Sequence, residues 1–407
     1  MAELTLRAIS ADELVAFSDC VMDVFGVDPA FDPAAQERQR ALLPVERAVA
    51  VFDGATVVAT AAAFTLELAV CGGRAAMGGL TNVTVRPTHR RRGLLRRLMA
   101  AHLADVAARG EPLSGLYASE GGIYQRFGYG VAAHSDTLAI AGGDGTIPPG
   151  PGDEVRMVDA ATAATLAPPV YAAATADRPG TYQRTPAWWT WRLIADRPSG
   201  RRGRGPRRWV VCARAGVVTG YAAYRQALGF VDGRADGAID IDELVAIDPL
   251  AEATLWRHLT AIDLCPRIVA NDQPVDSALP WLVANPRAVS HRGRADTLWL
   301  RLHDVAAALT ARRYQADGTL VIAVDDPLAP APRAWRLEVA GGGATCAATT
   351  AAPDLTLALP ALGSIYLAGV SPTRLHHAGH VTGSPAAIAL ATAMFAWPVA
   401  PWCPEQF

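Results

Sequence analysis

Residues 83–96, VTVRPTHRRRGLLR, bring three consecutive arginines and a glycine to the start of a predicted helix. The first backbone N–H groups of a helix have no intrahelical partner, and together with the helix dipole they attract anions. Gly93 would let a phosphate approach the backbone, while arginine side chains supply charge and bidentate donors. The segment therefore predicts a phosphate-binding turn, with an exposed basic helix start as the alternative. The side chains expected to meet the phosphate are Arg90, Arg91 and Arg96.

A second polar segment follows at residues 117–130, YASEGGIYQRFGYG. A predicted strand runs into Ser119 and Glu120, a glycine pair comes next, and Tyr124 follows. A tyrosine hydroxyl has an ordinary pKa near 10, so it donates a proton to a leaving group only when it is well positioned. Considered alone, Tyr124 is better interpreted as a packed aromatic residue than as a general acid.

Strand and helix signals alternate around these two segments. The pair Asp53-Gly54 suits a hairpin turn between two apolar runs, and Pro87 ends the strand before the arginines. Apolar residues then recur at helical spacing up to Gly110, which suits the position after a helix end. The sequence therefore predicts strands at 47–52, 57–67, 79–86 and 112–118, with a helix from Leu94 to Val106 between the last two.

The Gly- and Pro-rich stretch 142–152, GGDGTIPPGPG, is the clearest linker in the chain. Beyond it, valines and alanines of 51–63 recur at 211–223 with an offset of 160 (211 − 51). VTVRP at 83–87 recurs as VAIDP at 245–249 with an offset of 162 (245 − 83). These matches predict a duplication, with chance recurrence in an alanine-rich chain as the alternative. The second copy keeps the strand and the helix but lacks the arginine run and the glycine.

The pattern changes again from about Thr297, where strands at 298–303, 320–325, 334–340 and 355–359 mix with helices at 305–314 and 361–368. This indicates a third unit of α+β type. We therefore expect a mixed α+β chain with three domains, at 1–147, 148–294 and 295–407.

Composition excludes several classes of protein. The 407 residues are 51% apolar and 19% charged, which is enough apolar material for buried cores and unlike a disordered or fibrous chain. A net charge of −2 gives no electrostatic case for nucleic acid. The chain has no lysine, which excludes Schiff-base chemistry by a lysine side chain. Six scattered cysteines, none at the two polar segments, predict neither disulfides, a metal site nor a covalent acyl-enzyme. With no leader or membrane span in the pattern, we expect a soluble cytoplasmic protein.

Together the two polar segments resemble the acetyl-CoA site of the GNAT N-acetyltransferase superfamily. An Arg/Gln-x-x-Gly-x-Gly/Ala turn there is matched by Arg90 to Leu95, and Leu95 departs from the usual small residue. A Tyr-x-x-x-Gly-Phe/Tyr motif is matched by Tyr124 to Tyr129. The strings PTHRRRGLL and ASEGGIYQRFGYG are similar to the Eis (enhanced intracellular survival) family in particular. That resemblance implies tandem GNAT folds, the N-terminal one active and the central one degenerate, followed by a domain like the sterol carrier protein fold.

The resemblance also implies roles for individual residues. Backbone groups of Val83, Thr84 and Val85 would pair with the pantetheine arm of acetyl-CoA, and Ser119 and Glu120 would line the cofactor cleft. Tyr124 would be the general acid that protonates the departing thiolate, and the C-terminal carboxylate of Phe407 would be the base. Burial would raise the pKa of that carboxylate from its ordinary value near 3.5 toward a useful range. The turn that would hold the pyrophosphate comprises Arg90, Arg91, Arg92, Gly93, Leu94, Leu95 and Arg96.

The implied reaction is direct acetyl transfer to the amines of a polycationic acceptor, such as an aminoglycoside, a polyamine or a basic peptide. Transfer at more than one amine, a role in antibiotic resistance and a homohexamer belong to the same resemblance, and no metal, nucleic acid or membrane is expected. Two alternatives stay open at this point. One is a protein-lysine acetyltransferase, and the other is a non-catalytic protein that binds acyl-CoA or a lipid.

Four further features are better interpreted as structure than as chemistry. The tryptophans at 188, 189 and 191 suit a core or an interface more than a cation-binding site. The arginine-rich stretch 201–208 suits a solvated loop. The acidic stretch 232–243 has Arg234 where a calcium-binding loop needs a carboxylate, so a hairpin is the better prediction. The histidines at 376, 377 and 380 suit surface or turn positions.

Overall fold

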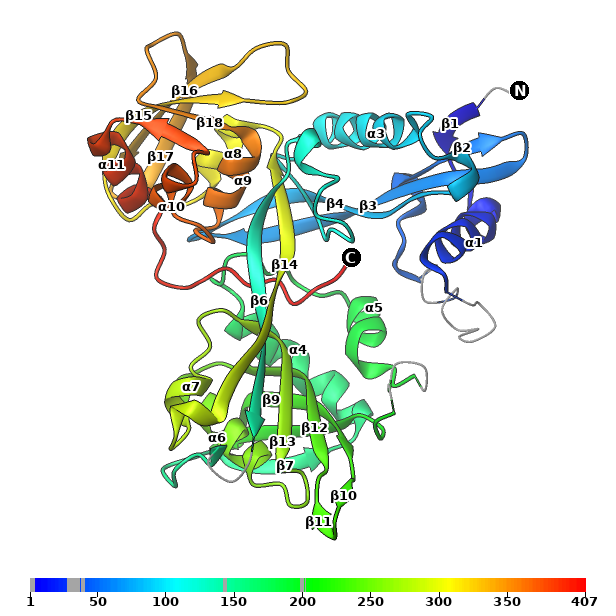
Figure 1. The fold of residues 1–407 in the computed structure, drawn as a ribbon, viewed down its shortest axis with the longest axis vertical. Helices are drawn as coiled ribbons and strands as arrows, with labels where there is room; N and C mark the ends of the chain where they lie inside the picture. The colour runs from blue at the N-terminus through cyan, green and yellow to red at the C-terminus, as the bar shows by residue number, and fades with distance from the viewer. Residues whose placement is uncertain (1–3, 28–36, 38–40, 142–144, 198–200, 202) are drawn as a thin grey trace. The chain divides into compact units, whose positions relative to one another are not determined.

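The computed structural model describes residues 4–27, 37, 41–141, 145–197, 201 and 203–407. It divides into two compact units (Figure 1). One unit combines Met1–Ala133 with Asp296–Phe407, and the other is His134–Ala295.

The first unit begins with a mostly antiparallel set of strands. The predicted hairpin around Gly54, which has a φ of 59°, is confirmed. β1, β2, β3 and β4 pair antiparallel in that order, and β5 then pairs parallel to β4 after the crossover helix α3. The bounds are β1 Leu4–Ala8, α1 Leu14–Phe25, β2 Ala48–Asp53, β3 Thr56–Val70, β4 Gly73–Val85, α3 Leu94–Ala108 and β5 Leu113–Leu116.

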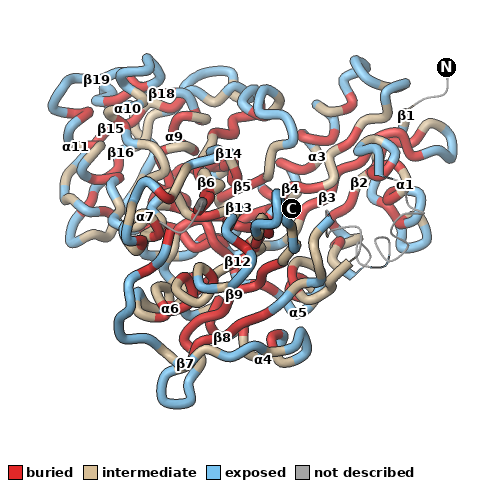
Figure 2. Tube along the Cα trace, turned by 60° about the horizontal axis from the view of Figure 1, so that its bottom comes forward, coloured by how far each residue is buried: buried red, intermediate tan, exposed pale blue. Residues whose placement is uncertain are grey.

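Helices α1 and α3 cover opposite faces of these strands. Along β2, Ala50 and Phe52 pack in one apolar cluster with Phe17 of α1, whereas Val51 packs in another with Leu98 of α3. This division follows from the alternation of side chains along a strand. Figure 2 shows the buried strands of this region in red between partly exposed helices.

The C-terminal part of the first unit is a five-stranded sheet in the order β17-β16-β15-β18-β19 with four helices. The helix predicted at 305–314 ends earlier than expected, at Ala311. After α11 the chain continues without helix or strand to Phe407, and we call residues 396–407 the tail. The bounds are α8 Val305–Ala311, β15 Gly318–Asp325, β16 Arg333–Ala340, β17 Gly343–Thr349, β18 Leu355–Ala358, α9 Leu359–Tyr366, α10 Pro372–His377, β19 Val381–Gly383 and α11 Pro385–Phe395.

The second unit repeats the pattern of the first. β8, β9 and β12 pair antiparallel, and β13 pairs parallel to β12 after the crossover helix α6. The parallel pairing of Met77–Leu80 with β5 corresponds to that of residues 238–241 with β13, at an offset of 161 (238 − 77). The bounds are β7 Glu154–Val158, α4 Ala160–Ala174, α5 Pro186–Trp189, β8 Arg208–Arg214, β9 Val217–Ala227, β10 Phe230–Val231, β11 Arg234–Ala235, β12 Ala238–Ala246, α6 Pro249–Thr260, β13 Arg267–Pro274 and α7 Leu279–Leu282.

The last strand of each repeat is exchanged. β6 (Gly130–Ala141) follows the first repeat in the sequence, yet its residues 135–141 pair with β13 of the second unit. β14 (Val289–Leu302) follows the second repeat, yet its residues 299–302 pair with β5 of the first unit. Each repeat therefore completes its sheet with a strand that the other one encodes.

Among the features interpreted as structural, the tryptophans and the acidic hairpin are confirmed, and the interpretation of the loop at 201–208 is corrected. Trp188 and Trp189 are buried, and β10 and β11 form the expected hairpin with Asp232 and Gly233 at its turn. The loop at 201–208 is not simply solvated, because Arg204 pairs with Asp240, Arg207 with Asp242 and Arg201 with Asp196. Arg202 of that loop lies outside the described residues.

Candidate active site

The strands β4 and β5 separate next to residues 83–85, where the sequence predicts that the pantetheine arm of acetyl-CoA binds. Their parallel pairing ends at Leu80 and Leu116, whereas β4 continues to Val85. Just beyond the last pair, β4 has a bulge opposite β3 at Asn82, whose φ is 51°. A bulge bends a strand and disrupts its ladder. The predicted residues 83–85 therefore lie on a strand edge that β5 does not cover, where a ligand amide can pair with the backbone.

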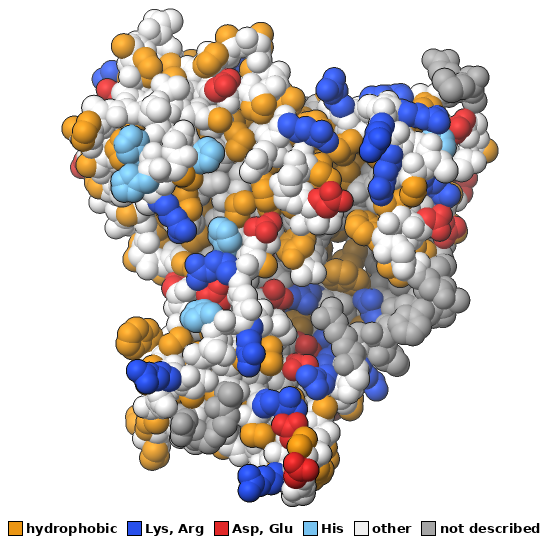
Figure 3. All heavy atoms as spheres, viewed as in Figure 1, with side chains coloured by type: hydrophobic (Ala, Val, Ile, Leu, Met, Phe, Trp, Pro, Cys, Tyr) orange, Lys and Arg blue, Asp and Glu red, His pale blue; other side chains and the backbone are white. Residues whose placement is uncertain are grey.

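The arginine turn follows this edge and leads into α3. Arg91 and Gly93 both have left-handed backbones, with φ of 63° and 76°. Gly93 is the N-cap of α3 without a side-chain hydrogen bond, and an added Cβ there would meet no atom within 4 Å. Arg90, Arg91, Arg92 and Arg96 are exposed, while Leu94 is buried and Leu95 is half-buried in the core beneath them. Figure 3 shows arginine side chains (blue) gathered over the region of α3 on this face.

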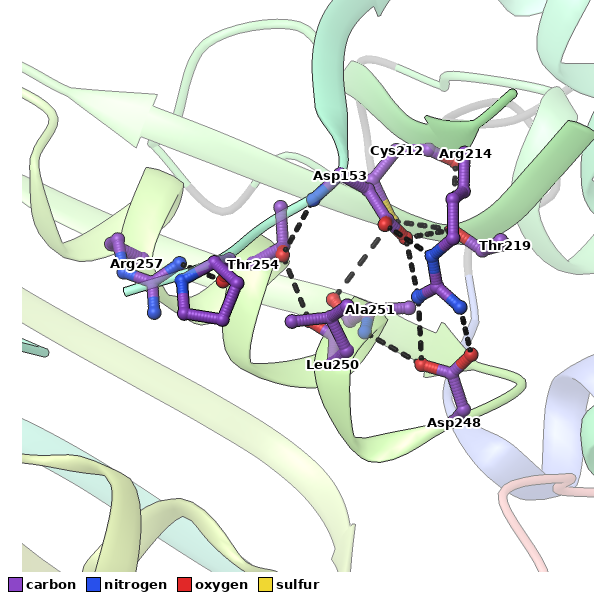
Figure 4. A network of polar contacts seen from close by, with 10 residues as sticks. Asp153, Cys212, Arg214, Thr219, Asp248, Leu250, Ala251, Thr254 and Arg257 are labelled. Atoms are coloured by element: carbon purple, nitrogen blue, oxygen red, sulfur yellow. Dashed lines mark hydrogen bonds and ion pairs between the residues drawn. The ribbon is translucent and has the colours of Figure 1, made fainter. Parts of the chain in front are cut away.

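The N-terminus of α6, the crossover helix of the second unit, is capped by a side chain (Figure 4). The Asp248 side chain caps α6 by accepting a hydrogen bond of 2.9 Å from the Ala251 amide. Arg214 bridges Asp248 and Asp153, with its Nε 2.8 Å from the Asp153 carboxylate. The Arg214 and Ala251 contacts lower the pKa of Asp248, so the carboxylate stays charged at the start of α6. The start of α6 thus carries a side-chain cap that the start of α3 lacks.

Tyr124 lies in the core on the α3 side of the first unit. It is 6% exposed, and its apolar cluster includes Leu80 of β4, Leu94 of α3 and Leu116 of β5. Its hydroxyl makes no hydrogen bond to a residue that the structure describes. Burial, with a smaller contribution from Glu120, raises the pKa of Tyr124 above its ordinary value of 10. Tyr124 is therefore held in the protonated form that a general acid needs.

The turn after Tyr124 is fixed from two sides. The Phe127 amide donates to the Tyr124 carbonyl at 2.9 Å, and Gly128 has a φ of 86°. Arg301 of β14 donates to the Phe127 carbonyl at 3.0 Å and pairs with Asp326. A Cβ at Gly128 would lie 2.0 Å from the Arg301 guanidinium, so only glycine fits here. The exchanged strand therefore helps to position Tyr124.

A buried polar network behind Tyr124 was not predicted from the sequence. The Tyr129 ring meets the Tyr124 ring edge-on, with centroids 6.1 Å apart. The Ser114 hydroxyl lies 2.7 Å from both the Tyr129 hydroxyl and His102 Nε2. Burial, with a smaller contribution from Arg47, lowers the pKa of His102 to about 3. The network thus joins α3, β5 and the Tyr124 turn through neutral groups.

The tail ends at the point where β4 and β5 separate. Gln406 Nε2 lies 3.5 Å from the hydroxyl of Tyr117, the residue after β5. The Phe407 ring lies against Phe64 of β3, with centroids 6.5 Å apart and an interplanar angle of 78°. The structure therefore brings Phe407 to the same end of the sheet as the predicted residues 83–85 and Tyr124. Ser119 and Glu120 lie in the turn between Tyr117 and Tyr124.

A cavity of about 460 Å³ lies at the opposite end of β5 from this site. It is lined partly by Glu111, before β5, and by Asp326. Both carboxylates are ion-paired, with Arg47 and Arg301 respectively. The motif residues thus lie outside this cavity, at the fork between β4 and β5.

The described residues contain no group of three or more His, Cys, Asp and Glu side chains arranged to hold a metal ion. None of the six cysteines, all of which lie in the described residues, forms a disulfide. Among the described helices, none has both the length and the apolar character needed to cross a membrane.

Comparison with protein-family models assigns three parts of the chain. Residues 5–132 and 180–302 each match an acetyltransferase (GNAT) domain, and residues 305–404 match a sterol carrier protein domain. These matches confirm the predicted architecture of two GNAT folds and a sterol-carrier-protein-like domain. GNAT acetyltransferases use acetyl-CoA, and the uncapped start of α3 and the uncovered edge of β4 suit its pyrophosphate and pantetheine.

Individual relatives agree with this assignment. The chain is 38% identical over 411 residues to an uncharacterized N-acetyltransferase of Streptomyces avermitilis, covering 99% of each. It is 34% identical over 355 residues to the N-acetyltransferase Eis of Mycobacterium bovis, covering 82% of this chain and 83% of the relative. The crystal structure of Eis1 from Mycobacterium abscessus matches with a TM-score of 0.86 at 33% identity, over 99% of this chain and all of the other. The chain is accordingly an N-acetyltransferase and belongs to the Eis family.

Proposed function

We propose that this enzyme transfers the acetyl group of acetyl-CoA directly to amines of a polycationic acceptor, at more than one position. The observation that carries the proposal is the meeting of four features at one end of β4 and β5. These are the bulged edge of β4, the uncapped start of α3, the protonated Tyr124 and the end of the tail. Cytoplasmic location, a role in antibiotic resistance and a homohexamer are part of the same proposal, by similarity to the family.

In the proposed reaction, the acceptor nitrogen attacks the thioester carbonyl carbon and the carbon–sulfur bond breaks. The nitrogen loses its proton through water to the terminal carboxylate of Phe407, and the departing thiolate takes a proton from Tyr124. Backbone groups of residues 83–85 hold the pantetheine arm, and Ser119 and Glu120 line the cleft. The turn from Arg90 to Arg96 neutralises the pyrophosphate. Positioning accounts for much of the rate, because it replaces encounters in solution.

The first test is release of CoA thiol by the purified full chain with aminoglycosides, polyamines and lysine-containing peptides. Turnover with aminoglycosides or polyamines supports the proposal, and mass spectrometry counts the acetyl groups added. Turnover with lysine side chains of folded proteins alone would make the enzyme a protein-lysine acetyltransferase. Acetyl-CoA binding without turnover on any acceptor would favour an acyl-CoA-binding role.

A companion test removes Phe407. If its carboxylate is the base, deletion abolishes turnover and leaves the dissociation constant of acetyl-CoA unchanged. Appending one glycine after Phe407 keeps the ring but moves the carboxylate, and the same loss is expected. Full activity of both variants would contradict the role of the terminal carboxylate.

A further inference from the structure

Gly79 of β4 lies beneath the last residue of the tail. It is paired with Phe64 of β3 and with Gly115 of β5, one residue before the β4–β5 pairing ends. Its φ is not in the left-handed region, so an alanine is compatible with the backbone here. A Cβ at Gly79 would nevertheless lie 3.2 Å from Phe407 Cε2 and 2.7 Å from Leu66 Cδ1. An alanine here would therefore press on both side chains, so the constraint on Gly79 is one of space rather than of conformation.

Three side chains form a seat over the bare backbone of Gly79. Phe64 and Leu66 project from β3 on one face of the sheet, since side chains two residues apart share a face. The Phe407 ring packs on them from the tail, edge-on to Phe64. An aromatic side chain that covers a glycine on the neighbouring strand restores contacts which the glycine lacks. The ring of Phe407 thus has a defined place although residue 406 before it is exposed.

The opposite face holds this segment of β3 in place. Gly78 lies beneath a buried ion pair between Arg47 and Glu111, and a Cβ there would lie 2.8 Å from the Glu111 carboxylate. Arg47 also donates to the Phe64 carbonyl at 3.2 Å and to the Thr65 hydroxyl at 2.9 Å. The backbone under the seat is thereby tied to a buried charge pair, which limits its ability to yield.

We propose that Gly79 is a positioning residue for Phe407, whose ring it admits so that the terminal group lies at the fork of β4 and β5. This rests on the proposed function, in which the carboxylate of Phe407 takes the acceptor's proton. Gly79 itself contacts neither of the reacting groups in that scheme. Its substitution should therefore slow the transfer step without weakening acetyl-CoA binding.

The test is Gly79→Ala in the full chain. The added Cβ would require the Phe407 ring to shift by a few tenths of an ångström. Displacement of a reacting group by about 1 Å can cost on the order of 100-fold in rate, so we expect kcat to fall about 3- to 10-fold. The dissociation constant of acetyl-CoA from calorimetry should stay unchanged. Gly293→Ala is the matched control, because Gly293 lies on β14 with no atom within 4 Å of an added Cβ and should keep full activity. Unchanged kcat in Gly79→Ala would overturn the proposal.

A double-mutant cycle separates positioning from a general loss of packing. In a Phe407→Ala chain, which keeps the terminal carboxylate but lacks the ring, Gly79→Ala should cost no further activity, since its target is gone. Equal losses with and without the Phe407 ring would contradict the proposal, as would full rescue of Gly79→Ala by Leu66→Ala, which would trace the effect to Leu66. Thermal unfolding of each variant identifies any that fails to fold, and Phe407→Leu in the Gly79→Ala chain then tests relief of the ring contact by recovery of kcat.

Deletion of Phe407 distinguishes this proposal from the one on which it rests. Full activity without Phe407 would remove the carboxylate from the mechanism. If the chain without Phe407 is inactive while the Gly79→Ala chain turns over normally, the carboxylate keeps its proposed role. The proposal that Gly79 positions Phe407 is then rejected.

Discussion

At the scale of single residues, the proposed site combines one exposed basic turn with one buried tyrosine. The arginines of the turn are exposed, whereas Tyr124 is 6% exposed and packs next to Tyr129 in the apolar core. Burial disfavours the phenolate, so the same packing that buries Tyr124 keeps its hydroxyl protonated. Tyr124 thus needs no partner to stay protonated at neutral pH.

Tyr124→Phe tests this assignment. It removes the proton donor and keeps the ring, so kcat should fall about 100- to 10,000-fold, the usual contribution of general acid catalysis. Acetyl-CoA binding should persist. In the unaltered enzyme, the raised pKa of Tyr124 places the loss of the donor above pH 10, so no decline of kcat from this group is expected below that pH. The measurement is the pH profile of kcat for both chains, and a Tyr124→Phe chain with normal kcat would refute the role.

The buried His102 should make the stability of the folded chain depend on pH. Its pKa is about 3 in the folded chain, against an ordinary value of 6.5, so the unfolded chain binds its proton first. The stability that neutral His102 supports is complete above pH 6.5 and declines as the pH falls from 6.5 toward 3. The slope approaches about 1.4 kcal/mol per pH unit for one group.

Replacement by glutamine should remove this slope. Denaturant unfolding of the original and His102→Gln chains at pH 7, 6 and 5 isolates the contribution of His102 from that of other titrating groups. The difference between the two chains should shrink as the pH falls. A difference that is constant with pH would show that His102 is not buried neutral.

Several of these residues were found from the sequence and others were not. The turn at 90–96 and Tyr124 are contiguous motifs, so their chemistry is visible in short strings. His102 and Ser114 are 12 residues apart on a helix and a strand, and no local pattern shows that they meet. Gly79 is one glycine in a predicted strand, and its role depends on a ring 328 residues later (407 − 79). Contacts between residues far apart in the sequence thus could not be predicted from it.

At the scale of elements, the helix ends differ in which groups cap them. The start of α3 has no side-chain cap, whereas the start of α6 is capped by Asp248. Two other helices, α9 and α11, meet at their C-terminal ends. Their last carbonyls, at Tyr366 and Phe395, accept hydrogen bonds from the guanidinium of Arg312. Arg312 is 1% exposed and lies against the rings of Tyr314 and Phe395. A cation at two helix C-termini is favoured by both dipoles.

Arg312→Met should destabilise the C-terminal sheet and loosen the tail that begins one residue after α11. Removing the guanidinium leaves buried carbonyls without this donor, which costs about 1–3 kcal/mol for each unsatisfied group. We expect a lower unfolding temperature together with a reduced kcat, because the tail carries Phe407. Circular dichroism melts and turnover of Arg312→Met and Arg312→Lys check this, with the lysine chain intermediate. Equal stability of all three chains would contradict it.

Elements were predicted better than their partners. Proline and glycine punctuation located β2, β5 and α3 closely, because these residues restrict or release the backbone locally. β4 begins at Gly73, six residues (79 − 73) before the predicted start, and β3 runs on to Val70 instead of ending at Glu67. The loop at 201–208 was misjudged, since the acids that neutralise its arginines, Asp240 and Asp242, lie on β12 more than 30 residues away. A strand pattern likewise shows that β6 and β14 are strands without showing which strand each will join.

At the scale of the whole molecule, strand exchange makes the two repeats depend on each other. Residues of β5 are fully buried, and one of their two neighbours, β14, is encoded after the second repeat. A fragment of residues 1–147, the predicted first domain, would expose the edge of β5 and lose Arg301 from the Tyr124 turn. Exposed edge strands promote aggregation.

We therefore expect the fragment 1–147 to be insoluble or unfolded when it is produced alone, and the full chain to be folded. Solubility and the dispersion of amide NMR signals report the outcome. A folded, acetyl-CoA-binding fragment would show that the exchanged strand is dispensable. Coexpression with a fragment of residues 148–407 should restore solubility, since it supplies β14.

The exchanged strand also determines when the first sheet can be completed during synthesis. The residue that pairs with Leu113 is Leu302, so the ribosome must add 189 residues (302 − 113) after β5 before its partner exists. At about 5–20 residues per second, this takes roughly 10–40 s. During that interval the nascent N-terminal repeat lacks the strand that supports its Tyr124 turn. The central repeat, whose crossover helix is capped by Asp248, cannot be lost from the gene without taking with it the strand that completes the first.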